Sequence, residues 1–534
     1  MLLIGACSSP DAEPGADDAA PAAGDGNQAE HGASSDGLRF VGPDPDALLN
    51  AEQLAALSFE VEADQPEQLE ALVVLLDGQP VTDGLEVDGT RLRYTPDDLP
   101  DGPRTVSITA AENEGDDEVM HHEWRFEVKA TPPVLELDEP SGPVVADQPV
   151  TVTGVTEPAA TVEIGAAEVT VDDDGGFTLV LDTVDPLLTV VATDAAGNTE
   201  QIERELVVLP SRVEVDEVRT VHVTFWAWAS PQLREPILEL IDRGAINAVQ
   251  LDLKDEGGQI GYASQVELAE QIGATTTAID LEAAVAELHE LGVAVVGRIV
   301  AFADPRLAAW AWESGERDMV IQLTDGSDYY RGSYAGFSNY VHPDVIAYNL
   351  DLAEEAAAAG VDHILWDYIR RPEGQSNYTV PGLETSPEAA IADFTRQADE
   401  RLAPYGVQHG ASVYGIAADR PEQIGQDIPA MAEHLDYVAP MIYPSHWGPG
   451  EYGVADPNRQ PYDIVRATLE VWQETVADRR ARVVPWLEDT SYRAWDRPHQ
   501  VREQWRGTLD QGIDEWLMWN PGSSYTTSVY EPRS

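Results

Sequence analysis

The sequence predicts a multidomain protein in which two all-β sandwiches are followed by a (β/α)8 TIM barrel. Between residues 38 and 210, short runs of alternating polar and apolar residues are separated by Gly, Pro and Asp turns, as in β-sandwiches. From residue 218 onward, apolar strands alternate with helical stretches, which is typical of βα units. No glycine-rich phosphate-binding turn follows the first of these strands, so a closed barrel is favoured over an open doubly wound sheet.

The N-terminal segment predicts a surface anchor rather than a folded domain. Residues 3–7 (LIGAC) resemble a bacterial lipobox, in which the cysteine receives a lipid, and the apolar stretch before Cys7 is too short for a transmembrane helix. Residues 8–37 are rich in Ala, Gly, Asp and Pro and predict a disordered acidic tether. We interpret residues 1–37 as a truncated lipoprotein signal and tether, and expect an extracellular protein that is lipid-anchored at Cys7 to the outer face of the cell membrane.

Residues 38–130 and 131–210 each predict one immunoglobulin-like β-sandwich. Alternation is clear at 57–61 (LSFEV) in the first module and at 150–154 (VTVTG) in the second. The turn at 192–198 (ATDAAGN) resembles the last hairpin of bacterial immunoglobulin-like modules. We expect these modules to be spacers, with carbohydrate binding as the alternative.

The barrel is predicted over residues 218–530. Its eight strands are expected at 219–226, 246–254, 293–300, 363–369, 408–414, 436–443, 482–487 and 513–519, with helical segments between most of them. Catalytic groups of such barrels lie at the carboxyl ends of the strands. The residues at those ends are therefore the candidates for a site.

The charge of the chain restricts its partners. The 97 acidic residues outnumber the 31 basic ones and give a net charge of −66, which repels nucleic acid and anionic membrane surfaces. Lysine occurs only at Lys129 and Lys254, and the acidity indicates a salt-adapted (halophilic) surface rather than a substrate preference. The single cysteine excludes an intrachain disulfide framework and a cysteine zinc site.

Alternation in the second barrel strand sorts its residues between two faces. Apolar residues at 249, 251 and 253 should face the helices, so Asp252 and Lys254 should point into the barrel mouth, with Asp255 just beyond. Lys254 is the only lysine of the barrel and stands beside two carboxylates. It predicts either a substrate contact or a structural ion pair.

Strand four ends in the run 363–372 (HILWDYIRRP), in which Asp367 interrupts an apolar strand. Burying a carboxylate in this way is costly unless it is paired. Strand three carries Arg298 among apolar residues, and this guanidinium also needs an anionic partner. We therefore expect Arg298 and Asp367 to pair.

The ends of the other strands collect carboxylates and aromatic rings. Sugar rings pack their C–H faces on aromatic side chains, and glycosidic cleavage needs two carboxyl groups. Glu488 and Asp489 stand at the end of strand seven. The residues expected to bind substrate are Trp226, Lys254, Asp255, Arg298, Tyr443, His446, Trp486 and Trp519.

Five segments of the barrel together resemble a bacterial family of glycosyl-hydrolase-like barrels, catalogued as domain of unknown function 4015. They occur in the expected order, at 247–255 (NAVQLDLKD), 298–305 (RIVAFADP), 366–370 (WDYIR), 439–446 (APMIYPSH) and 485–489 (PWLED). The family is distantly similar to α-amylase-type barrels. The resemblance spans roughly residues 218–525.

The resemblance implies that Asp367 is the catalytic nucleophile. The chain departs from the family on strand five, where Ser412 stands in place of the usual Asp. The second carboxylate is therefore expected elsewhere, first at Asp489 and then at Asp252 or Glu488.

The leading functional hypothesis is a cell-surface glycoside hydrolase that acts on a polysaccharide. Asp367 would be the nucleophile or base, one of the three other carboxyls the proton donor, and no cofactor or metal is expected. The alternative is a non-catalytic carbohydrate- or cell-wall-binding protein on a degenerate barrel. A metal-dependent hydrolase is disfavoured because strand one carries only His222 rather than a His-x-His pair. We expect a monomer.

The net charge predicts that salt stabilises the protein. At about 0.1 M salt the screening length is about 10 Å, and at 1 M it is about 3 Å, so repulsion between neighbouring carboxylates should fall across this range. We expect the melting temperature, followed by circular dichroism, to rise steadily from low salt to molar sodium or potassium chloride. A melting temperature that stays flat or falls would show that the acidity is not a salt adaptation.

Overall fold

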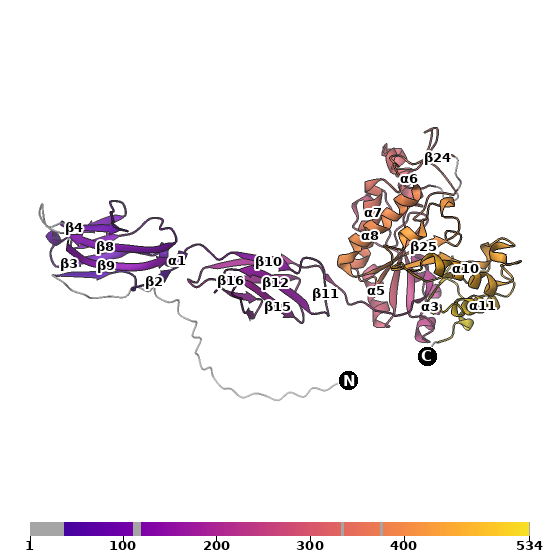
Figure 1. Ribbon diagram of the computed structural model, residues 1–534, viewed down its shortest axis with the longest axis horizontal. Coiled ribbons are helices and arrows are strands. Elements are labelled where there is room, and N and C mark those ends of the chain that lie inside the picture. Colours follow the sequence, from indigo (N-terminus) through magenta and orange to yellow (C-terminus); the bar gives the residue numbers. More distant parts are fainter. Residues whose placement is uncertain (1–36, 111–118, 333–335, 374–376, 533–534) are drawn as a thin grey trace, which may run out of the picture. The chain divides into compact units, whose positions relative to one another are not determined.

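The computed structural model describes residues 37–110, 119–332, 336–373 and 377–532. Strands β1–β10 and β12–β17 belong to one compact unit, and residues 206–534 make up most of a second one. In its described residues, the first unit consists of β-sheets with one short α-helix and one 3-10 turn, whereas the second contains the barrel (Figure 1). The prediction of N-terminal β-sandwich sheets followed by a TIM barrel is confirmed.

The N-terminal β module consists of two sheets with an aromatic core. One sheet has the order β1 (Leu38–Val41), β3 (Phe59–Ala63), β7 (Arg91–Tyr94), β6 (Leu85–Asp88). The other has the order β2 (Ala47–Leu49), β9 (Val119–Val128), β8 (Gly102–Ala110), β4 (Leu72–Leu76), β5 (Gln79–Pro80), and helix α1 spans Ala51–Ala55. The rings of Phe59 and Trp124 meet between the sheets with centroids 5.1 Å apart. Alternation in β3 buries Phe59, Val61 and Ala63 on one face, as the sequence pattern predicts.

The second β module repeats this arrangement with shorter strands. One sheet joins β10 (Leu135–Glu139), β12 (Val150–Thr156) and β15 (Gly176–Leu181). The other has the order β14 (Ala167–Val169), β13 (Thr161–Ile164), β16 (Leu187–Thr193), β17 (Thr199–Glu205). Two short strands, β11 (Val144–Val145) and β18 (Val208–Leu209), pair with each other in the barrel unit.

The barrel is a closed ring of parallel strands. Its order is β25 (Gln408–Tyr414), β23 (His363–Asp367), β21 (Ala294–Val300), β20 (Ala248–Lys254), β19 (Arg219–Val223), β29 (Trp516–Trp519), β28 (Trp486–Glu488), β26 (Tyr437–Met441), β27 (Arg482–Val483). The pairing of β25 with β26 closes the ring. Pro485 interrupts the seventh strand because it has no N–H to donate, so β27 and β28 share one position in the ring of eight.

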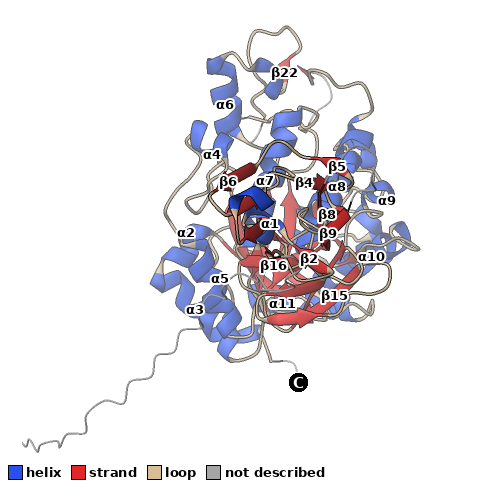
Figure 2. Ribbon diagram, turned by 90° about the vertical axis from the view of Figure 1, so that its left-hand side faces the viewer, coloured by secondary structure: helices blue, strands red, loops and turns tan. Residues whose placement is uncertain are grey.

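Helices surround the strands on the outside (Figure 2). They are α2 (Phe225–Ala229), α3 (Pro231–Asp242), α4 (Glu267–Gln271), α5 (Leu281–Glu290), α6 (Pro305–Ser314), α7 (Pro343–Ala358), α8 (Pro387–Leu402), α9 (Ile428–Met431), α10 (Pro461–Thr475) and α11 (Arg497–Leu509). Many begin at a side-chain cap: Asp280 accepts the backbone N–H of Ala283, and Ser386 accepts that of Ala389. Two short strands, β22 (Gln322–Leu323) and β24 (Tyr378–Thr379), pair above the ring. None of the helices in the described part of the chain is long and apolar enough to cross a membrane.

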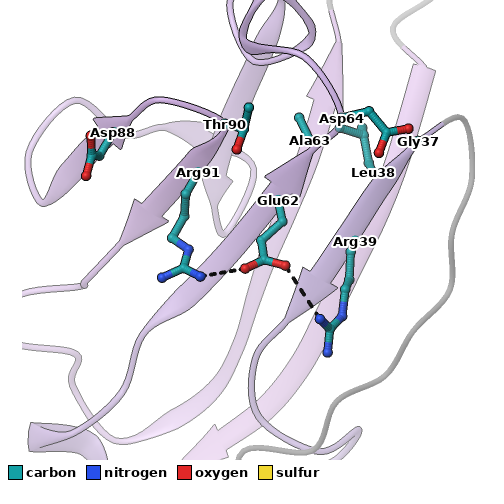
Figure 3. A pocket seen from close by; sticks show the side chains of 9 residues that line it. All are labelled: Gly37, Leu38, Arg39, Glu62, Ala63, Asp64, Asp88, Thr90 and Arg91. Carbon is teal, nitrogen blue, oxygen red and sulfur yellow. Dashed lines mark hydrogen bonds and ion pairs between the residues drawn. The ribbon is translucent and has the colours of Figure 1, made fainter.

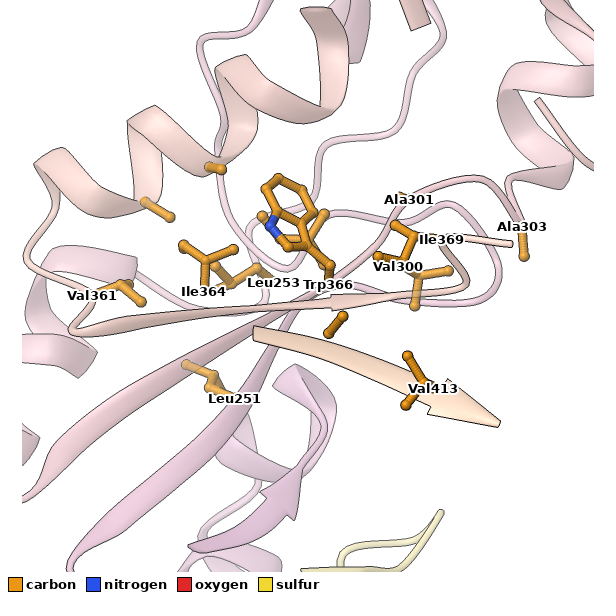
Figure 4. Packing of buried hydrophobic residues seen from close by; sticks show 14 of the residues in the cluster. Leu251, Leu253, Val300, Ala301, Ala303, Val361, Ile364, Trp366, Ile369 and Val413 are labelled. Atoms are coloured by element: carbon orange, nitrogen blue, oxygen red, sulfur yellow. The ribbon is translucent and has the colours of Figure 1, made fainter. Parts of the chain in front are cut away.

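Trp366 fixes the orientation of strand β23. Its fully buried ring points outward and meets Phe394 of α8 edge-on, with centroids 5.0 Å apart, and its Nε1 donates to Nδ1 of His409 at 3.3 Å. Leu253 and Ile364 pack in the same layer (Figure 4). Since neighbouring residues of a strand face opposite sides, Asp367 must point into the barrel.

The first barrel strand is shorter than predicted. It ends at Val223 because Thr224 accepts the backbone N–H of Ala227 at 3.1 Å and starts helix α2. Trp226 therefore lies on a helix rather than on a strand. Its side chain is 55% exposed.

Candidate active site

A pocket of about 190 Å³ lies at the carboxyl ends of the barrel strands. It is lined by Glu256, Arg298, Asp367, Tyr368, Arg370, Tyr414, Gly415, Met441, Tyr443, His446, Trp486 and Trp519. Seven different strands or the loops after them contribute these residues. Of the residues predicted from the sequence, Arg298, Asp367, Tyr443, His446, Trp486 and Trp519 line this pocket.

Asp367 and Arg298 form a buried ion pair. Nε and Nη2 of Arg298 donate to Oδ2 of Asp367 at 2.9 and 2.7 Å. The other oxygen, Oδ1, accepts the backbone N–H of Tyr368 at 2.7 Å. Tyr368 takes a left-handed backbone conformation, with φ of 51°, which is uncommon for a residue with a side chain. The Asp367 carboxylate is thus fixed from both sides at the mouth of the barrel.

Arg298 binds two further carboxylates. Its Nη1 donates to Oδ1 of Asp252 at 2.8 Å, and its Nη2 pairs with Oε1 of Glu256. Burial alone would lower the pKa of Arg298, but Glu256, Asp252 and Asp367 together raise it well above its ordinary value. Arg298 is therefore a permanent cation that holds three carboxyl groups of the site.

Asp252 lies deep in the barrel, as predicted, but it is unsuited to donate a proton. Its Oδ1 lies 2.9 Å from Nε2 of His222 as well as near Arg298. Burial would raise the pKa of Asp252, yet His222 and Arg298 outweigh it and lower this pKa. The carboxylate is therefore a fixed negative charge beneath the pocket.

Glu256 was not among the site residues predicted from the sequence. The candidates at the end of strand two stopped at Asp255. Its side chain is 43% exposed and stands in the pocket beside Asp367. One oxygen of each carboxylate contacts the same nitrogen, Nη2 of Arg298. Two oxygens on one nitrogen cannot be farther apart than two hydrogen-bond lengths, about 6 Å.

Glu488 is buried at the end of β28, and its pKa is higher than that of an ordinary glutamate. Oε1 accepts the backbone N–H of Ser445 and Oε2 accepts the Ser445 hydroxyl, both at 2.6 Å. Burial raises the pKa of Glu488 to about 7, although the hydrogen bonds from Ser445 and Thr490 lower it. Glu488 is not itself among the residues that line the pocket, but its Oε2 lies 3.9 Å from Nδ1 of His446, which does line it. At a pKa of about 7, this carboxyl group is about half protonated at neutral pH.

The structure places Asp489, the residue expected first as the proton donor, in an ion pair with Arg497 outside the pocket. Because Trp486 and Glu488 face the barrel, Asp489 faces the opposite side of the same strand. There it pairs with Arg497 and accepts the N–H and hydroxyl of Thr526 at 2.7 and 2.9 Å and the hydroxyl of Tyr530 at 3.1 Å. Asp489 anchors α11 and the C-terminal segment, and it does not line the pocket.

Lys254 and Asp255 are also placed away from the pocket. The pairing of β20 with β21 shifts between Asp252 and Lys254, which turns Lys254 out of the barrel mouth. Its Nζ forms a buried ion pair with Asp304 at 2.8 Å and lies over the ring of Tyr348 at 4.5 Å. The buried ion pair favours the structural alternative for Lys254 over the substrate contact. Asp255 accepts the backbone N–H groups of the turn at 257–259, both at 2.9 Å, and so stabilises that turn.

Aromatic rings form one wall of the pocket. Tyr443 and Trp519 stack with centroids 4.9 Å apart and an interplanar angle of 15°. Trp486 lies edge-on to Tyr443, with ring centroids 6.3 Å apart, and the Arg298 guanidinium lies over the Trp486 ring at 5.7 Å. Trp226, also expected to bind substrate, is on α2 and is not among the residues that line this pocket.

Strand five contributes no carboxylate to the pocket. Ser412 is 1% exposed, and its Oγ has no hydrogen-bond partner among the described residues. Tyr414, two residues farther on the same face, lines the pocket instead. In the described part of the chain, no group of three or more His, Cys, Asp or Glu side chains could hold a metal ion.

A second hollow, of about 600 Å³, lies on the N-terminal β module (Figure 3). Its charged side chains neutralise one another: Glu62 binds Arg91 at 2.6 Å and Arg39 at 3.5 Å. The residues that line it include no aromatic ring. The hollow therefore lacks the stacking surface that a sugar ring would need.

The barrel and the residues that line its pocket lie in a segment that matches the model of a protein family. Residues 220–525 match the model of the family described as "Putative glycosyl hydrolase domain", domain of unknown function 4015. The chain belongs to this family. The resemblance inferred from the five motifs is thereby confirmed. In this member of the family, residues 138–204 also match a bacterial immunoglobulin domain.

Solved structures include several similar barrels, whereas no curated protein matches the chain. A hypothetical protein from Ruminiclostridium thermocellum is 28% identical, over 36% of this chain and 96% of its own, with a TM-score of 0.32. The glycoside hydrolase domain of PgaB from Bordetella bronchiseptica is 17% identical, over 60% of this chain and 100% of its own, with a TM-score of 0.44. The spore cortex-lytic enzyme SleL of Bacillus megaterium is 11% identical, over 62% of this chain and 75% of its own, with a TM-score of 0.37.

Proposed function

We propose that the barrel hydrolyses glycosidic bonds of a polysaccharide, with Asp367 as the nucleophile or base and Glu488 as the proton donor. The observation that carries the proposal is the Asp367 carboxylate, held by Arg298 at the carboxyl end of a barrel strand and facing a pocket with an aromatic wall. Such walls suit the apolar faces of sugar rings, and paired carboxyl groups suit glycosidic cleavage.

Two carboxyl groups accompany Asp367, and they differ in what they can do. A proton donor must carry its proton at the working pH, and burial gives Glu488 a pKa of about 7. Glu256 is more exposed and pairs with Arg298, so its position suits the orientation of a sugar hydroxyl beside Asp367. Burial raises the pKa of Tyr443, and the charges of Asp367 and Glu488 add to this rise.

In the proposed reaction, the Glu488 carboxyl donates its proton to the glycosidic oxygen as the bond to the anomeric carbon breaks. Asp367 bonds to that carbon, after which water displaces it and loses a proton to the Glu488 carboxylate. Alternatively, Asp367 takes a proton from the water that attacks the carbon directly. The first route retains the anomeric configuration and the second inverts it. Product anomer analysis distinguishes the two routes.

Asp367→Asn should abolish hydrolysis and leave the fold intact, because it keeps the size of the side chain and removes its charge. We expect turnover of a panel of polysaccharides to fall by at least about 10²-fold. Asp255→Asn is the matched control, since Asp255 caps a turn outside the pocket. Full activity of the Asp367 variant would contradict the assignment. Glycan binding without cleavage by the wild type would favour the non-catalytic binding protein.

Glu488→Gln should remove the basic limb of the pH profile, which is the fall in activity at high pH. Since the donor acts in its protonated form, wild-type activity should be highest below pH 7 and fall as the pH rises through the Glu488 pKa of about 7. The variant should lose that fall, lose about 10²-fold or more on natural glycosides, and lose little on aryl glycosides whose leaving groups need no proton.

Glu256→Gln is measured in parallel with Glu488→Gln. It should weaken substrate binding and leave the dependence on the leaving group unchanged. If Glu256→Gln shows the loss on poor leaving groups and Glu488→Gln does not, the donor is Glu256 and the assignment of Glu488 fails.

We also propose that the full-length protein is anchored outside the cell through a lipid on Cys7, which lies outside the described residues. The lipobox-like residues 3–7 and the acidic tether that follows support this location. The wild type should partition with membranes, and Cys7→Ser should release it into the soluble fraction. An unmodified Cys7 in mass spectra of the wild type would contradict the proposal.

A further inference from the structure

The pocket is smaller than the substrate that the proposed function requires. Its volume of about 190 Å³ is below the range of about 300–1,000 Å³ that is typical of sites enclosing a small molecule. It has room for little more than the reacting sugar unit. The remaining units of a polymer must therefore lie over the rim, where side chains exposed in the free protein would receive them.

Four aromatic side chains lead from the pocket to this rim. This aromatic row consists of Trp519, Tyr443, His446 and Tyr492. Tyr443 stacks on Trp519 at 4.9 Å, His446 follows Tyr443 at 5.5 Å, and Tyr492 follows His446 at 5.5 Å. Exposure rises from Tyr443, at 7%, through His446 to Tyr492, at 55%, whereas Trp519 at the other end of the row is half-buried. The steps between ring centroids are comparable with the length of one sugar unit.

Tyr492 is held in place although it is exposed. Arg493 lies over its ring at 5.4 Å, and Nη1 of Arg493 donates to the backbone carbonyl of Ser445 at 3.0 Å. Arg493 itself has a φ of 51°, a conformation that costs energy in a residue other than glycine. Among the described residues, the Tyr492 ring makes aromatic or cation–π contacts only with His446 and Arg493. A large apolar ring is thus presented to solvent at the rim by a strained turn.

The nearby Trp495 provides a contrast. It is also exposed, at 42%, but its Nε1 donates to the carbonyl of Asn458 at 3.0 Å and its ring contacts His499 at 5.3 Å. Within the described part of the chain, Trp495 makes no ring contact with the aromatic row. Exposure alone therefore does not single out Tyr492, whereas its continuity with the pocket wall does.

We propose that Tyr492 is an outer sugar-binding platform that sets the preference of the enzyme for long chains. This inference rests on the proposed hydrolase function and deepens it. A sugar unit outside the pocket stacks its C–H face on the Tyr492 ring, while the reacting unit lies at Asp367. Tyr492 touches no reacting atom, so it affects the binding of long substrates and leaves the chemical step unchanged.

The test uses the full-length protein and oligosaccharide ladders from dimers to octamers of α-glucan, β-glucan, chitin and mannan. KM and kcat are measured for the wild type, Tyr492→Ala, Tyr492→Phe and the control Trp495→Ala. We expect Tyr492→Ala to raise KM by about 3- to 10-fold for the longer oligomers, with kcat unchanged and the shortest cleaved oligomer unaffected. Tyr492→Phe keeps the ring and should behave as the wild type does, and Trp495→Ala should have no dependence on chain length.

The outcomes separate this inference from the proposed function. If the wild type cleaves oligomers and Tyr492→Ala matches it at every length, the platform is overturned and the hydrolase stands. An equal loss at every length, or the same loss in Trp495→Ala, would indicate a structural role and also overturn it. If the wild type binds without cleaving, the hydrolase fails, and the dissociation constants across the ladder decide on Tyr492. If no ladder is bound, both proposals fail.

Discussion

The guanidinium of Arg298 is the interaction on which the site depends. It is 2% exposed and binds Asp252 below, Asp367 beside it and Glu256 at the rim. Removing one partner of a buried ion pair typically costs about 3–5 kcal/mol, because the remaining charge stays buried without compensation. Arginine cannot lose its proton in a protein, so it keeps these carboxylates in place at any pH at which the fold persists. A lysine could not bridge three acids in one plane.

The barrel supplies the geometry that Arg298 needs. Arg298 is level with Asp252 on one neighbouring strand and lies diagonally below Asp367 on the other. Trp366 locks its strand against α8 from outside, so the next residue, Asp367, faces inward. The apolar outer layer therefore determines which polar groups meet inside. Packing and chemistry are coupled through the alternation of the strands.

The alternation of polar and apolar residues along the chain was sufficient to predict most of the fold and part of the site. Alternation and apolar partners predicted the Arg298–Asp367 pair, because two buried opposite charges on adjacent strands have few other solutions. The same alternation, extended from Trp486 to the end of the strand, would have predicted that Glu488 faces the barrel and that Asp489 faces away from it. Lys254 could not be placed from sequence, since a shift in strand register turned it outward. Glu256 and Tyr492 lie in loops, whose paths depend on tertiary contacts that no short-range pattern records.

Adjacent Glu488 and Asp489 have opposite surroundings, one holding a proton near neutral pH and the other bound to Arg497. A shift of one residue in this strand would exchange them, placing the ion-paired acid inside and the proton-holding acid against the C-terminal segment. Strand seven should therefore tolerate almost no insertions or deletions during evolution. The loop that follows carries Tyr492 and is free of that restriction. Under the proposed function, a change in the length of this loop would alter the outer sugar-binding surface and leave Glu488 and Asp489 in place.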